Sequence, residues 1–147
     1  MSLVNLSTLK ECFAHTKGRV GYQMGAKPAL GSDSSTFDTA DCSGWVRWAL
    51  DRAGLTVPDG SATQHEFCKS RYASVPYAKA AIAGANQLFI AFEEPTPIGH
   101  VWLGWKDADG VVRTHECHGG AFHRGVDSRP WNALASICTA VYDLPTS

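Results

Sequence analysis

The spacing of apolar residues changes once along this 147-residue chain, and that change constrains the fold more than any other feature. Up to about residue 83, apolar residues recur at helical spacing, as in Leu9, Cys12 and Phe13. From residue 87 onward the apolar runs are short and strand-like. We expect strands over residues 87–92, 100–105, 111–117 and 137–144. Helices followed by an antiparallel sheet predict an α+β fold, in a single domain that covers residues 1–147.

The charge balance excludes several classes of function. The chain has 13 basic and 14 acidic residues, for a net charge of −1, and no basic run that would attract nucleic acid. No apolar stretch approaches a membrane span, and Met1–Lys17 lacks the pattern of a secretory signal. We therefore expect synthesis in the cytoplasm, a monomer, and neither a nucleic-acid nor a membrane partner.

The five cysteines are widely spaced, and their number is odd. An odd count without a signal peptide argues against a disulfide framework, and the absence of C-x-x-C argues against structural zinc. The run from His115 to His118 alternates between two faces of a strand, so only two of its side chains could share an ion. We expect no metal and no cofactor.

Cys42 marks the start of a predicted helix. A loop rich in Ser, Asp and Thr precedes it, Val46, Ala49 and Leu50 follow at helical spacing, and Gly54 is a C-terminal stop. Free N–H groups and the helix dipole favour a thiolate at such a position, although a free cysteine is more often a small buried residue.

A cysteine nucleophile needs a histidine base and a third group that orients it. A four-residue hairpin loop at Asp107–Gly110 would place His100 opposite Cys117 and on the same face as His115. A register shift of one residue would instead bring Glu116 to the face of His100. His100 is therefore the candidate base, with His115 as its predicted orienting residue and Glu116 as the alternative.

Three motifs occur in the order typical of one enzyme family. They are Asp41-Cys42-Ser43-Gly44-Trp45-Val46, then His100-Val101-x-Leu103-Gly104, then Thr114-His115-Glu116. The chain resembles the NlpC-type, papain-like cell-wall cysteine peptidases, in which the first motif opens the nucleophile helix and the second supplies the base. Tyr22 in Gly21-Tyr22-x-x-Gly25 is similar to the family's upstream tyrosine.

The resemblance implies that the Cys42 helix packs on a C-terminal antiparallel sheet. It also implies an amidase or endopeptidase that cleaves the stem peptide of peptidoglycan at the bond between D-glutamate and the following diamino acid. Cys42, His100 and His115 would be catalytic, and Tyr22, Asp41 and Ser43 would face the substrate. The alternatives are a thiol acyltransferase or transpeptidase, and a non-catalytic cell-wall-binding domain.

Stand-alone domains of this kind resemble phage lysis proteins and secreted antibacterial amidase effectors. Such a protein would reach the cell wall through lysis or a secretion system. An effector would also have a cognate inhibitor or immunity protein as a partner.

Overall fold

The computed structural model describes residues 2–94, 99–120 and 124–147. Its main elements follow the chain in this order: α1 (Leu6–Thr16), β1 (Gly21–Tyr22), β2 (Thr39–Ala40), α2 (Cys42–Arg52), α3 (Ser61–Lys69), α4 (Tyr77–Ala80), β3 (Leu88–Glu93), β4 (His100–Lys106), β5 (Val112–His118), β6 (Gly125–Asp127) and β7 (Ala140–Leu144). Short 3₁₀ turns lie at Ser34–Thr36 and Trp131–Leu134.

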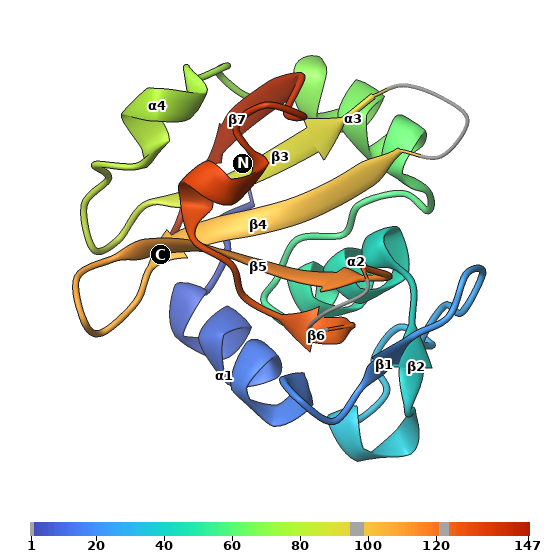
Figure 1. Ribbon diagram of the computed structural model, residues 1–147. Coiled ribbons are helices and arrows are strands. Elements are labelled where there is room, and N and C mark those ends of the chain that lie inside the picture. The colour runs from blue at the N-terminus through green and yellow to red at the C-terminus, as the bar shows by residue number, and fades with distance from the viewer. Residues whose placement is uncertain (1, 95–98, 121–123) are drawn as a thin grey trace.

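The C-terminal half forms a five-stranded antiparallel sheet with the order β6-β5-β4-β3-β7. Helices α1 and α2 lie along one side of this sheet, whereas α4 lies on the other side (Figure 1). The predicted α+β class, with the Cys42 helix against the sheet, is confirmed.

Both faces of the sheet are buried. On one face, Trp45 and Leu50 of α2 pack with Leu103 of β4 in the larger core cluster. On the other face, Trp102 and Trp131 belong to a second cluster. Because β3 is covered on both sides, its side chains are apolar at successive positions and do not alternate with polar ones.

Helix α2 begins at Cys42, as predicted. Asp41 caps it, since one carboxylate oxygen accepts a hydrogen bond from Gly44 N at 2.7 Å. Gly54 follows the helix with a φ of 102°, a left-handed conformation that suits glycine. Helix α1 is capped by a different side chain type. The cap is Asn5, whose side chain accepts from Thr8 N, and the helix begins at Leu6.

The hairpin between β4 and β5 differs from the prediction in register. Leu103 pairs with His115, and Lys106 with Val112 is the last pair, so the loop has one residue more than expected. Gly110 adopts a φ of 84°, and Asp109 accepts a hydrogen bond from Val111 N, which together accommodate that residue. The shift moves His115 to the face opposite His100 and brings Glu116 to the same face.

No helix in the described part of the chain is long and apolar enough to span a membrane.

Candidate active site

Cys42 is the first residue of α2 and is 8% exposed. Its thiol lies close enough to the imidazole of His100, the first residue of β4, to raise the pKa of that imidazole. Cys42 also stands at the N-terminus of α2, the positive end of the helix dipole. The predicted nucleophile and the predicted base therefore lie close together.

Glu116 completes a line of three groups. Its Oε1 lies 2.7 Å from His100 Nε2, and its side chain is fully buried. Because Nε2 faces Glu116, Nδ1 is the imidazole nitrogen that remains for Cys42. The order thiol, imidazole and carboxylate is that of a nucleophile, a base and an orienting group.

The pKa values of this pair move in opposite directions. Burial lowers the pKa of His100, but hydrogen bonds with Cys42 and Glu116 outweigh it and raise the pKa to about 9. Burial raises the pKa of Glu116, but hydrogen bonds from His100 and Arg129 outweigh it and bring the pKa to about 2. At neutral pH the site therefore holds an imidazolium beside a carboxylate.

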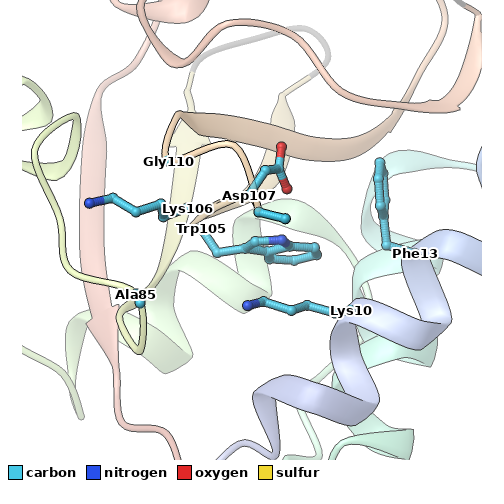
Figure 2. A pocket seen from close by; sticks show the side chains of 8 residues that line it. Lys10, Phe13, Ala85, Trp105, Lys106, Asp107 and Gly110 are labelled. Atoms are coloured by element: carbon cyan, nitrogen blue, oxygen red, sulfur yellow. The ribbon is translucent and has the colours of Figure 1, made fainter.

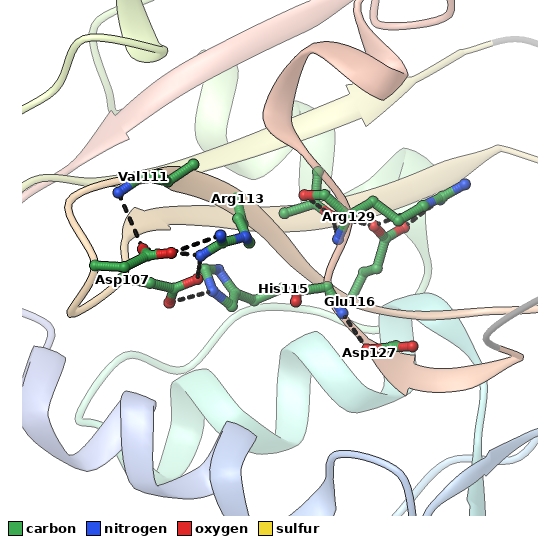
Figure 3. A network of polar contacts seen from close by, with 10 residues as sticks. Asp107, Val111, Arg113, His115, Glu116, Asp127 and Arg129 are labelled. Carbon is green, nitrogen blue, oxygen red and sulfur yellow. Dashed lines mark hydrogen bonds and ion pairs between the residues drawn. The ribbon is translucent and has the colours of Figure 1, made fainter.

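His115, the predicted orienting residue, does not contact His100. Its Nε2 lies 3.0 Å from Asp107, and its ring stacks on Trp105 with a centroid distance of 3.5 Å. Figure 3 shows His115 directed toward Asp107 and Glu116 directed toward Arg129. Burial, offset in part by Asp107, lowers the pKa of His115. The placement predicted for His115 is wrong because the hairpin loop is one residue longer than expected.

Tyr22 lies in β1, near Cys42. A Cβ added to Gly119 would come within 2.9 Å of its ring, so the end of β5 packs closely on this tyrosine. Burial and the nearby Cys42 raise the pKa of Tyr22, which keeps its hydroxyl protonated and able to donate a hydrogen bond.

Asp41 and Ser43 flank Cys42, and both are held by Lys27, a residue that the sequence did not single out. Lys27 Nζ lies 2.7 Å from Asp41 Oδ2 and 2.7 Å from Ser43 Oγ, and 3.3 Å from Asp59. Burial lowers the pKa of Lys27, but Asp41 outweighs it and the pKa is raised. The geometry gives Asp41 and Ser43 a bracing role at the helix start. Their predicted contact with substrate stays a prediction, which their position beside Cys42 supports.

A different cavity lies at the opposite end of β4. It has a volume of about 410 Å³, and its lining includes Lys10, Phe13, Trp105 and Asp107 (Figure 2). No predicted site residue lines it, and we do not place the substrate there. Across the described ranges, no three His, Cys, Asp or Glu side chains are arranged to hold a metal ion. The five cysteines are free thiols.

Comparison with solved structures shows what the fold resembles. The peptidoglycan hydrolase RipB of Mycobacterium tuberculosis superposes with a TM-score of 0.58 at 22% identity, over 93% of this chain and 63% of RipB. The P60 domain of an M. avium subspecies paratuberculosis antigen gives 0.63 at 18% identity, over 95% and 93% of the two chains.

RipD of M. tuberculosis gives a TM-score of 0.57 at 16% identity, over 96% of each chain. It is described as a non-catalytic NlpC/p60 domain protein adapted to peptidoglycan binding. No protein-family model and no curated protein matches this sequence. The neighbours thus include both a hydrolase and a binding protein, and what they share with this chain is its architecture: the chain has the papain-like NlpC/P60 fold.

Proposed function

We propose that this protein is a cysteine amidase that hydrolyses an amide bond in the stem peptide of peptidoglycan. The observation that carries the proposal is the line of Cys42, His100 and Glu116, in which a helix-terminal thiol contacts an imidazole held by a buried carboxylate. The fold of RipB, itself described as a peptidoglycan hydrolase, supports the choice of substrate.

The reaction follows from the charges in the site. The Cys42 thiolate attacks the amide carbonyl carbon and forms a C–S bond, while the carbonyl π electrons move onto oxygen. The backbone N–H of Cys42 and the hydroxyl of Tyr22 stabilise this oxyanion. When the oxyanion collapses, the C–N bond breaks, and the imidazolium of His100 gives its proton to the leaving amine.

Hydrolysis of the thioester restores the enzyme. Neutral His100 takes a proton from water, the resulting hydroxide attacks the acyl carbon, and the C–S bond breaks to release Cys42 as a thiolate. Glu116 stays ionised throughout and stabilises the imidazolium at each step where it forms.

The same proposal includes the bond that is cleaved, the residues that border the substrate, and the place where the protein acts. The bond cleaved is that between D-glutamate and the following diamino acid, and Tyr22, Asp41 and Ser43 border the substrate. The chain acts as one monomeric domain over residues 1–147, on the cell wall, after delivery by lysis or a secretion system. An antibacterial effector of this kind would be paired with a cognate inhibitor or immunity protein.

The second candidate function is binding to peptidoglycan without catalysis, which RipD illustrates within the same fold. The contact between Cys42 and His100 favours catalysis, because binding alone does not require an activated thiol. A thiol acyltransferase would use the same groups but pass the acyl chain to an amine and not to water.

The test uses purified sacculi. We expect the wild-type protein to release soluble muropeptides and Cys42→Ala to release none, with both proteins equally folded by circular dichroism. Tight binding to sacculi without release by either protein would favour the RipD-like function. An added amine that captures the acyl group in preference to water would indicate a transferase.

A further inference from the structure

The carboxylate of Glu116 accepts more hydrogen bonds than the one it shares with His100. Arg129 Nη2 donates to Oε1 at 2.5 Å, and Arg129 Nε donates to Oε2 at 3.1 Å, so the guanidinium holds the carboxylate with both ends of its fork. The hydroxyl of Thr114 also donates to Oε2. Figure 3 shows the Arg129 side chain beside Glu116. Each carboxylate oxygen thus has two donors.

Two further hydrogen bonds join Thr114 and Arg129. Thr114 N donates to Arg129 O at 2.9 Å, and Arg129 N donates to Thr114 Oγ1 at 2.9 Å. The threonine hydroxyl has a single proton, and Glu116 Oε2 is its nearer acceptor, since Arg129 O lies 3.4 Å away. Next to this pair, Pro130 bridges to Arg113 of β5. The loop after β6 is therefore hydrogen-bonded to β5 just before Glu116 in the strand.

We propose that Arg129 and Thr114 are positioning residues that keep Glu116 ionised and directed at His100, and so maintain the imidazolium beside the Cys42 thiol. This inference deepens the proposed function and rests on it for the roles of Cys42 and His100. It assigns a task to two side chains that act through Glu116.

The charges around Glu116 support the assignment. A fully buried carboxylate would otherwise favour protonation, and Arg129 and His100 are the groups that keep its pKa low. Other titratable groups also face Glu116. Tyr77 lies on α4, and Asp127 is the pairing partner of Glu116 on β6. The remaining three belong to β5 and are His115, Cys117 and His118. Burial lowers the pKa of His118, so Arg129 is the second full positive charge beside Glu116.

Without Arg129, Glu116 would lose two donors and a positive charge but would remain buried. Its pKa would rise, and a protonated Glu116 would no longer stabilise the imidazolium of His100. The pKa of His100 would then fall, and thiolate formation at Cys42 would require a higher pH. The pH range in which the thiolate–imidazolium pair exists should therefore become narrower, with a higher lower limit and a lower upper limit.

The experiment measures the rate of iodoacetamide alkylation at Cys42 against pH, read by mass spectrometry of the Cys42 peptide. We expect Arg129→Met to move the lower inflection upward by about one pH unit or more, and Arg129→Lys, which keeps the charge but not the fork, to move it less. Inflections within about 0.3 units of the wild type in folded Arg129→Met would overturn the proposal.

A second pair of variants keeps the proposal testable if Arg129→Met does not fold. Thr114→Val removes the hydroxyl donor at constant shape, whereas Thr114→Ser keeps it. We expect a smaller shift in the same direction for Thr114→Val and the wild-type profile for Thr114→Ser; equal profiles would count against the role of Thr114. Because alkylation needs no peptidoglycan, a wild-type protein that alkylates as expected but cleaves no muropeptide refutes the proposed function alone.

Discussion

Replacing Glu116 by glutamine removes a charge from the site while it keeps the shape of the side chain. The carboxylate and the imidazolium of His100 are joined by a contact of 2.7 Å, and the carboxylate is fully buried. With charge centres roughly 4 Å apart and an effective dielectric constant of about 20, their attraction amounts to about 4 kcal/mol. Loss of this stabilisation of the imidazolium should therefore lower kcat/KM by about 10³-fold.

The matched control is His115→Gln, which alters the neighbouring residue of the same strand. His115 contacts Asp107 and Trp105 and not His100, so we expect kcat/KM within about threefold of the wild type. Both variants are assayed on a defined muropeptide, with circular dichroism as a check on the fold. Near-normal activity of Glu116→Gln together with a loss of about 100-fold in His115→Gln would refute the observed register and restore His115 as the orienting residue.

Two further predictions concern stability. Gly104→Ala should lower the free energy of urea unfolding by about 1–3 kcal/mol, because its Cβ would lie 2.2 Å from the Trp131 ring, whereas Gly84→Ala, with nothing closer than 3.6 Å, should change it little; equal effects would contradict the packing. The ion pair of Glu116 and His100 should also make stability depend on pH. The pKa of Glu116 falls from 4.5 to about 2 on folding, so its contribution is present above pH 4.5 and is lost as pH falls through 2. The pKa of His100 rises from 6.5 to about 9, so its contribution is present below pH 6.5 and is lost as pH rises through 9. Unfolding free energies that stay flat across both ranges would contradict these assignments.

The sequence predicted the helix that begins at Cys42 because its signals are local. Asp41 is a strong capping residue, the apolar spacing after Cys42 is helical, and Gly54 ends the pattern. The strands of the sheet were also predicted from their apolar runs, apart from short β6. Only three residues, Gly125–Asp127, form that strand, and so short a segment has no periodicity to read.

The partner of His100 could not be decided in the same way. A loop of four residues and a loop of five both fit the sequence around Gly110, yet they place opposite residues of β5 on the face of His100. The choice depends on contacts such as that of Asp109 with Val111 N, which the pattern of apolar residues does not reveal.

Lys27 and Arg129 were missed for a related reason. Each is a long charged side chain in a loop, and such residues usually lie in solvent. Their contacts join segments distant in the chain: Lys27 reaches Asp41 across 14 residues, and Arg129 reaches Glu116 across 13. Only the folded arrangement shows that Lys27 braces the start of α2 and that Arg129 holds the carboxylate of Glu116.

The central claim is that Cys42 becomes acylated by a stem peptide and that water then releases the product. The most direct test is incubation of the wild-type protein and Cys42→Ala with a defined muropeptide in ¹⁸O-labelled water, followed by mass spectrometry of both fragments. We predict one new amine terminus and one new carboxyl terminus that carries the label, with no cleavage by Cys42→Ala. Cleavage by Cys42→Ala at the wild-type rate, or an intact muropeptide after incubation with the folded wild-type protein, would contradict the claim.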